Sequence, residues 1–261
     1  MTSELLIEES GAVATIAFNR PAARNALSPA MLEEMASALE SFADRTDLRV
    51  VVLRGAGELP FSAGYDMTEL PSRTLGVEDA RAIHAPVRAA ADAIERCPQP
   101  VIGAAREFVF GAAFDLFLHC DLRICSDDTR FCMPPNRHGF LYPAQGLQRL
   151  AATAGLARAG FMLLTGNTVA ASQAVTDGIV QMMVPAANFE SELQSLCATV
   201  AGNAPLSLRE TKTMLQALAR GEIITADPAM YERIAACLNS ADVQEAKAAF
   251  REKRRPVFRG C

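Results

Sequence analysis

Short apolar runs alternate with longer segments of helical periodicity along most of the chain. The runs are rich in β-branched residues and too short for helices, which is typical of buried strands. The expected strands are Leu5–Glu8, Val13–Phe18, Val50–Leu53, Val101–Ala104, Leu122–Cys125 and Arg130–Cys132. The first two are joined at Ser10-Gly11, so we expect them to form a hairpin.

Two amphipathic helices are predicted between these strands. Methionine and leucine recur at helical spacing in residues 29–43, where Ser28 supplies an N-cap and Pro29 a first helical residue. Residues 71–96 begin with turn-forming residues and then become helical. The strands and helices together predict an α/β fold.

The pattern changes from residue 187 onward. Helical segments follow one another with no convincing strand between them, at Phe189–Ala201, Leu206–Arg220, Pro228–Leu238 and Ala241–Lys253. We therefore predict a strand-containing core over residues 1–186 and a helical region over residues 187–261. No Gly/Ser-rich linker separates them, so the helical region should dock on the core.

Composition narrows the function classes. The chain has 261 residues, half of them apolar, and a net charge of -5 without a basic stripe, so no nucleic-acid partner is expected. No apolar run is long enough to span a membrane, and we expect a cytoplasmic protein. Seven cysteines without a CxxC pair predict reduced thiols, with neither a disulfide framework nor a metal site.

Small residues open a helix directly after a strand near the middle of the chain. Gly111, Ala112 and Ala113 place no large side chain over the first helical turn. The first NH groups of a helix have no internal partner and attract negative charge, so an oxygen could bind there. Close packing of the strand on the helix is the alternative explanation of these small residues.

Several motifs in order add to this feature and resemble the crotonase superfamily, the enoyl-CoA hydratase/isomerase family. They are Asn19–Leu27, Phe61–Met67, Val109–Asp115, Leu163–Gly166 and Gly178–Val180. The resemblance implies a spiral of strand-strand-helix units with two roughly perpendicular sheets. It also implies a C-terminal helical part that covers the active site and packs homotrimers or dimers of trimers. The implied substrate is an acyl-CoA, and coenzyme A enters as part of the substrate, with no separate cofactor.

The resemblance assigns two backbone donors. In the family, two NH groups bind the thioester oxygen, and the matching residues here are Tyr65 and Ala112. Donors fixed before the reaction stabilise an enolate without reorganising. The implied substrate-binding and CoA-binding positions around them are Ala22, Ala23, Arg24, Ala63, Gly64, Asp66, Met67 and Gly111. Arg24 could pair with a phosphate of CoA or be a solvated surface residue.

The acid–base positions depart from the hydratase pattern. Asp115 stands where hydratases carry the first of two glutamates, and Pro135 stands at the second position. Because proline cannot act as an acid or a base, ordinary hydration and double-bond isomerisation are disfavoured. Asp115 is either a catalytic carboxylate or a structural one that bonds a helix or loop.

Three other functions stay open. The motifs with Tyr142 look closest to the methylmalonyl-CoA decarboxylase-like members, although Tyr65 and Pro134 replace their histidine and threonine. Decarboxylation needs an oxyanion hole and a proton donor, and Tyr142 or His138 could orient the substrate or supply the proton. His138 could instead activate water for hydrolysis of a thioester or carbon–carbon bond. The third alternative is a catalytically silent homologue that binds acyl-CoA or a partner protein.

Overall fold

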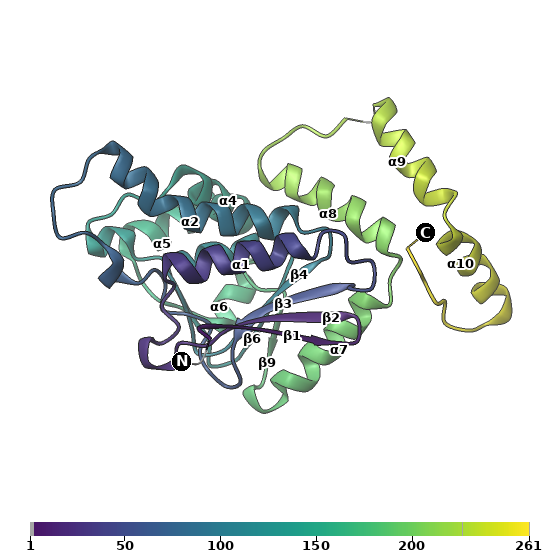
Figure 1. The fold of residues 1–261 in the computed structure, drawn as a ribbon, viewed down its shortest axis with the longest axis horizontal. Helices are drawn as coiled ribbons and strands as arrows, with labels where there is room; N and C mark the ends of the chain where they lie inside the picture. The colour runs from purple at the N-terminus through teal and green to yellow at the C-terminus, as the bar shows by residue number, and fades with distance from the viewer. Residues whose placement is uncertain (1–2, 226, 261) are drawn as a thin grey trace.

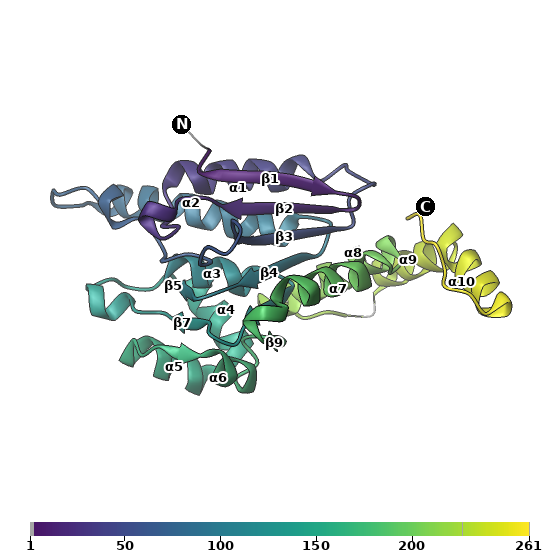
Figure 2. The ribbon, with the colours of Figure 1, turned by 90° about the horizontal axis from the view of Figure 1, so that it is seen from below.

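A six-stranded sheet forms the centre of the molecule in the computed structural model, which describes residues 3–225 and 227–260. Its strand order is β1-β2-β3-β4-β6-β9, and the first four lie side by side in Figure 2. The bounds are β1 (Leu5–Ser10), β2 (Val13–Phe18), β3 (Val50–Gly55), β4 (Val101–Ala105), β6 (Leu122–Ser126) and β9 (Met182–Val184). Only β1 runs antiparallel to its neighbour, which confirms the predicted hairpin at Ser10-Gly11.

A second sheet of three short strands was only partly predicted. It contains β5 (Phe108–Phe110), β7 (Arg130–Cys132) and β8 (Val169–Ala170), in that order. β7 has the predicted bounds Arg130–Cys132, whereas β5, β8 and β9 were not predicted, since strands of two or three residues carry little periodicity. The mixed α/β fold class is confirmed.

Two long helices lie side by side against one face of the large sheet (Figure 1). They are α1 (Pro29–Ser41) and α2 (Val77–Arg96), and Ser28 caps α1 by accepting a hydrogen bond from the Met31 NH at 3.2 Å. Between the sheet and these helices lies the largest core cluster, in which Phe61 stacks edge-to-face between Phe18 and Phe117. The remaining helices of this half are α3 (Ala112–His119), α4 (Ala144–Ala154), α5 (Leu156–Thr165) and α6 (Ala171–Thr176).

Helix α7 (Phe189–Ala201) covers the opposite face of the same sheet. Its buried residues Phe189 and Leu193 pack against Val50, Val52 and Ile102. With both faces covered, the buried parts of these parallel strands, Val50–Leu53 of β3 and the whole of β4, are continuously apolar. The predicted boundary between residues 186 and 187 stays a prediction, and α7 on its C-terminal side belongs to the packing of the sheet.

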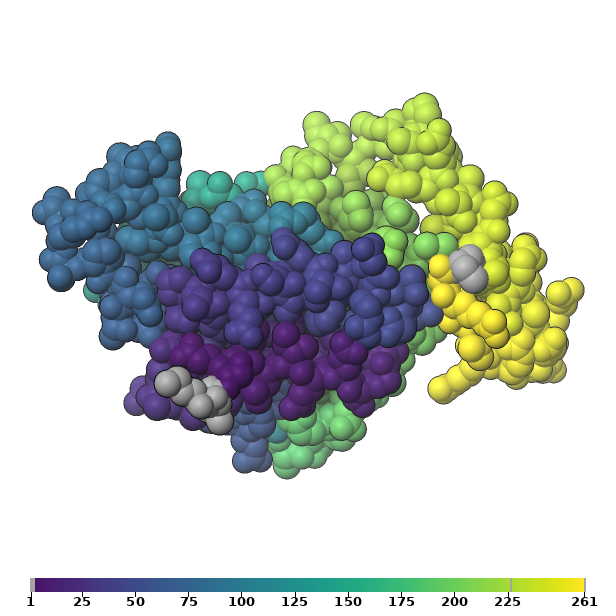
Figure 3. Space-filling model, viewed as in Figure 1, coloured from purple at the N-terminus to yellow at the C-terminus, as the bar shows by residue number. Residues whose placement is uncertain are grey.

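The last three helices lead away from the sheet. They are α8 (Pro205–Ala219), α9 (Pro228–Leu238) and α10 (Ala241–Glu252), each within one or two residues of its predicted range. Lys212 of α8 forms an ion pair with Asp121 of the core, with 2.8 Å between the Lys212 Nζ and the Asp121 Oδ2. Helices α9 and α10 project from one end of the molecule (Figures 1 and 3), and α9 has no buried residue.

Candidate active site

The two loops that carry the small-residue motifs lie against each other. Leu27 donates from its NH to the Gly64 carbonyl at 2.8 Å and accepts from the Asp66 NH at 2.9 Å. In a parallel bridge of this kind the residue between the two partners, Tyr65, has its NH turned to the opposite side. Within residues 3–225 and 227–260, the Tyr65 NH donates no hydrogen bond to the protein.

Glycine is required where these loops approach most closely. Gly64 has φ +101°, and a Cβ there would lie 2.7 Å from the Phe110 carbonyl oxygen. Gly111 precedes α3 with φ +53° and donates from its NH to the Cys132 carbonyl at 2.9 Å. Ala112 is the first residue of α3, so its NH has no partner in the helix and none elsewhere in the described chain. The predicted role of the Tyr65 and Ala112 NH groups is compatible with this geometry and stays a prediction.

Asp115 and Tyr142 are brought together across 27 positions of sequence. The Tyr142 hydroxyl, just before α4, donates to the Asp115 Oδ1 at 2.8 Å. Burial raises the pKa of Tyr142 well above its usual value, and the neighbouring Asp115 charge acts in the same direction. The hydroxyl is therefore firmly held in its protonated form.

A glycine that sequence reasoning missed makes room for this pair. A Cβ at Gly146, in the first turn of α4, would lie 2.6 Å from the Tyr142 hydroxyl oxygen and 2.7 Å from the Asp115 Oδ1. The available signal was a glycine inside an otherwise helical pattern, which often marks a close approach.

A cavity of about 260 Å³ borders the pair. Its walls come from α2, α3 and the start of α4, and they include Arg81, His84, Arg88, Asp115 and His119. Asp115 is the single carboxylate among the described lining residues, whereas the other four of these side chains are basic. Arg81 and Arg88 also pair with Glu78 and Asp92 outside the cavity wall, at 3.0 and 2.7 Å.

His119 was not predicted as a site residue, although it follows Asp115 by one helical turn. Its Nδ1 lies 2.7 Å from the Glu95 Oε1, and its Nε2 lies 3.8 Å from the Asp115 Oδ1. Glu95, on α2, also pairs with Arg149 and, at 3.1 Å, with Arg220. The i, i+4 spacing of Asp115 and His119 was a usable signal, but the partnership with Glu95 depends on the packing of α2 on α3.

Burial and neighbouring charges have opposite effects on the pKa of Glu95. Burial alone would raise the pKa of this carboxyl, but the hydrogen bond with His119 and the charge of Arg149 lower it to about 2. Glu95 is therefore ionised near neutral pH and can only accept a hydrogen bond. It follows that the proton on His119 Nδ1 points to Glu95, which leaves Nε2 directed to Asp115 and the cavity.

The structure does not bring His138 into this site. Pro135 and His138 belong to a 3-10 helix, η3 (Pro135–His138), and the His138 side chain is exposed and outside the cavity lining. Arg137 of the same turn bonds the Asn167 Oδ1 at 3.0 Å. The η3 turn begins at Pro135 and contains no acidic residue.

The predicted CoA-binding loop lies beside the Gly64 motif. Ala22 and Ala23 lie in η1 (Pro21–Ala23), and the exposed Arg24 accepts a hydrogen bond at its carbonyl from the Ala63 NH at 3.1 Å. The roles assigned to these residues stay predictions.

Asp66 and Met67 differ in their surroundings. Asp66 is buried, pairs with Arg20 at 3.0 Å and caps the turn η2 (Met67–Glu69) through the Thr68 NH. The hydrogen bond from the Thr68 side chain, together with Arg20, lowers the pKa of Asp66. Met67 is half exposed. Asp66 thus stabilises the loop that carries Tyr65, and the predicted substrate contacts of both residues stay predictions.

Two negative observations concern the described ranges only. No group of three or more His, Cys, Asp or Glu side chains in residues 3–225 and 227–260 is arranged to hold a metal ion. Over the same ranges, every helix is too short or too polar to cross a membrane.

Comparison with known proteins shows the family. The profile described as enoyl-CoA hydratase/isomerase matches residues 8–261. The chain is 32% identical over 253 residues to the methylmalonyl-CoA decarboxylase of Escherichia coli K12, covering 95% of each chain. It is also 32% identical to the 2,3-dehydroadipyl-CoA hydratase of that strain, covering 99% of each. A crystal structure of an enoyl-CoA hydratase/carnithine racemase from Magnetospirillum magneticum superposes with TM-score 0.94 at 30% identity, over 100% of this chain and 97% of the other. The chain therefore belongs to the enoyl-CoA hydratase/isomerase family of the crotonase superfamily.

Proposed function

We propose that the Tyr65 and Ala112 NH groups bind the thioester oxygen of an acyl-CoA and stabilise its enolate. The proposal is supported by the absence of a protein acceptor for either NH within the described chain and by the glycines that let the loops approach. Each such donor contributes about 3 kcal/mol of transition-state stabilisation, roughly a hundredfold in rate. No cofactor is proposed beyond the CoA of the substrate, whose nucleotide would lie along Ala22, Ala23 and Arg24.

The reaction proposed is decarboxylation of a methylmalonyl-type acyl-CoA. The choice rests on the charged side chains of the cavity, where Asp115, already bonded by Tyr142, shares the wall with Arg81, His84, Arg88 and His119. Such a wall suits an acyl group with its own carboxylate. A hydratase of this family would need a second glutamate where the chain has proline. One of the relatives, the Escherichia coli decarboxylase, bears the name of this reaction.

Decarboxylation requires no base to begin. The carbon–carbon bond to the carboxylate breaks, carbon dioxide leaves, and the electron pair enters the enolate held by the two NH groups. The basic side chains of the wall attract the substrate carboxylate into the cavity, whereas Asp115 disfavours a second carboxylate beside it and so destabilises the bound substrate relative to the neutral leaving group. The Tyr142 hydroxyl fixes Asp115 in this position.

Turnover by the purified protein tests the proposal. Methylmalonyl-CoA, malonyl-CoA and crotonyl-CoA are each incubated with the wild type, Tyr142→Phe and Asp115→Asn, and products are followed by mass spectrometry. Loss of carbon dioxide from a diacid thioester, slowed in both variants, is the expected result. Rapid hydration of crotonyl-CoA with no decarboxylation would contradict it, and the lack of any turnover would favour the silent homologue. His138 is exposed outside the cavity, so hydrolysis has less support.

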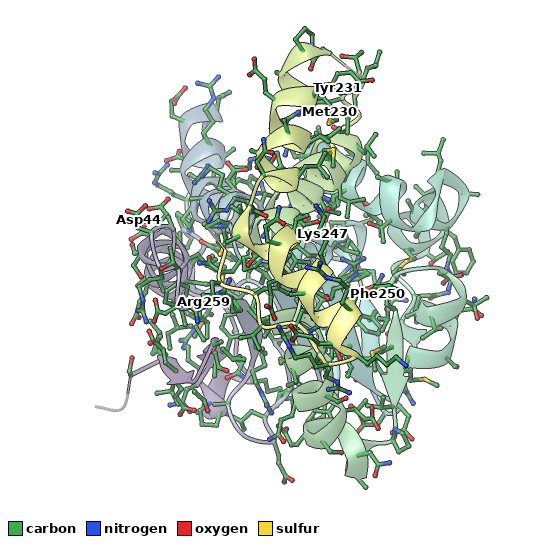
Figure 4. The ribbon with its side chains drawn as sticks, turned by 90° about the vertical axis from the view of Figure 1, so that its right-hand side faces the viewer. Asp44, Met230, Tyr231, Lys247, Phe250 and Arg259 are labelled. Atoms are coloured by element: carbon green, nitrogen blue, oxygen red, sulfur yellow. The ribbon has the colours of Figure 1, made fainter. Side chains whose placement is uncertain are left out.

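We also propose that the chain forms a homotrimer or a dimer of trimers through its projecting helices. Tyr231 of α9 and Phe250 of α10 lie at this end (Figure 4), with 61% and 86% of their surface exposed. Ile234 and Leu238 follow Tyr231 at helical spacing and are exposed too, and such a grouping of exposed apolar side chains is typical of a protein–protein interface. Size-exclusion chromatography with light scattering should give at least three times the mass of one chain, and a monomer would contradict the proposal.

A further inference from the structure

The proposed reaction needs a proton that the residues predicted from the sequence do not readily supply. After carbon dioxide leaves, the enolate carbon must be protonated once per turnover. The Tyr142 hydroxyl already donates a hydrogen bond to Asp115, and its raised pKa makes it a weak acid. His138 is exposed and outside the cavity. Another acid must therefore reach the substrate.

His119 is a buried histidine with a fixed ring in the wall of the cavity. Its side chain is only 4% exposed, and it lines the cavity together with Asp115. The bond from Nδ1 to Glu95 at 2.7 Å fixes the ring, and Nε2 lies 3.8 Å from the Asp115 Oδ1. That separation is too long for a direct hydrogen bond, and no other residue of the described ranges is hydrogen-bonded to Nε2, which can therefore meet a substrate atom.

The other histidine of the cavity is less suitable. His84 lines the wall from α2, but its side chain is exposed, and no hydrogen bond within the described ranges holds its ring. A proton donor must be positioned at the reacting carbon, because misplacement by about 1 Å can cost a hundredfold in rate. Of the chain's three histidines, His119 alone combines burial, a fixed ring and access to the cavity.

We propose that His119 is the catalytic acid that protonates the α-carbon of the enolate, with Glu95 as its positioning residue. This inference rests on the proposed decarboxylation. The step starts from the doubly protonated imidazolium, which keeps its Nδ1 proton hydrogen-bonded to Glu95. The Nε2–H bond breaks and leaves its electron pair on nitrogen, while the enolate carbon–carbon pair forms the new C–H bond and the thioester carbonyl is restored. Neutral His119 then takes a proton from solvent before the next turnover.

The stereochemistry of protonation tests this role. The reaction of methylmalonyl-CoA is run in D₂O, and both the rate and the configuration of the monodeuterated propionyl-CoA are measured. An acid held on one side of the enolate delivers deuterium to one face, whereas free solvent does so with little preference. His119→Gln and His119→Asn are both made, and circular dichroism identifies the folded variants. His138→Gln is the matched control, since that histidine lies outside the cavity.

The expected result is a single configuration from the wild type and from His138→Gln. In the His119 variants, kcat should fall about a hundredfold or more, with loss of the configurational preference. A folded His119 variant that keeps either the rate or the single configuration overturns the inference, because a purely structural role would slow the reaction without changing the face. A wild type that releases no carbon dioxide refutes the proposed function itself.

Glu95→Gln gives a second test that leaves the histidine in place. The variant keeps a carbonyl acceptor for Nδ1 and removes the charge, so the reaction should slow while the configuration stays single. Wild-type rate in Glu95→Gln would overturn the positioning role. Glu95→Gln can be measured even if both His119 variants fail to fold.

Discussion

Replacing Gly146 with alanine should separate the role of the Tyr142–Asp115 pair from ordinary helix stability. The added methyl would lie 2.6 Å from the Tyr142 hydroxyl oxygen and 2.7 Å from the Asp115 Oδ1. Both distances are well inside van der Waals contact, so the ring, the carboxylate or α4 must move. Gly160, in the middle of α5, offers a matched control, because a Cβ there meets no atom within 4 Å.

The magnitudes follow from these contacts. Alanine stabilises a helix interior by up to about 1 kcal/mol relative to glycine, and Gly160→Ala should gain most of it. Gly146→Ala should gain less stability from helix propensity, since residue 146 lies in the first turn of α4, and overpacking should lower its free energy of unfolding by about 1–3 kcal/mol. The two variants should thus differ by roughly 1–4 kcal/mol in free energy of unfolding. At about 2–4 °C per kcal/mol for a chain of this size, the midpoints of thermal unfolding should differ by several degrees.

Activity and thermal unfolding are measured on the same preparations. Gly160→Ala should unfold at a higher temperature and turn over methylmalonyl-CoA like the wild type. Gly146→Ala should lose at least tenfold in turnover, because a hydrogen bond to a charged group contributes about 1.5–3 kcal/mol. If Gly146→Ala were as active and as stabilised as Gly160→Ala, the close packing of this glycine on the pair would be refuted.

Three further predictions concern single groups. Ala112→Pro removes one NH at a first helical position, where proline is tolerated. The kcat for decarboxylation should therefore fall about a hundredfold, with little change in the midpoint of thermal unfolding. An unchanged kcat would refute the role of the Ala112 NH as a donor. The raised pKa of Tyr142 stabilises the fold below pH 10, and this contribution is lost as the pH rises above that value. Between pH 10 and pH 11, the midpoint of thermal unfolding should therefore fall less steeply in Tyr142→Phe than in the wild type. Equal slopes for the two proteins would contradict this prediction. The pKa of Glu95 is lowered from 4.5 to about 2, so this carboxyl stabilises the fold above pH 4.5 and the stabilisation is lost as the pH falls towards 2. In that pH range, the free energy of urea unfolding should depend less on pH in Glu95→Gln than in the wild type. Equal dependence in the two proteins would count against the lowered pKa.

The local sequence determined most of the regular elements. Residues 29–41 are helical as predicted, because Ser28 and Pro29 fix the start and the apolar stripe fixes the buried face. The segment Val50–Leu53 of β3 and the whole of β4 were recognisable because their side chains are apolar on both faces of the sheet. Among the strands of two or three residues, β7 was recognised and β5, β8 and β9 were not, because so short a segment carries little periodicity and depends on the strand with which it pairs.

For the candidate site, the sequence by itself determined which residues have unusual backbone freedom, and the glycines at positions 64 and 111 do adopt positive φ. Only the tertiary structure decided which side chains meet. Tyr142 reaches Asp115 across 27 positions, and Glu95 reaches His119 across 24. Backbone preferences depend on adjacent residues, so a sequence pattern records them, whereas contacts between α2, α3 and α4 depend on how the helices pack together.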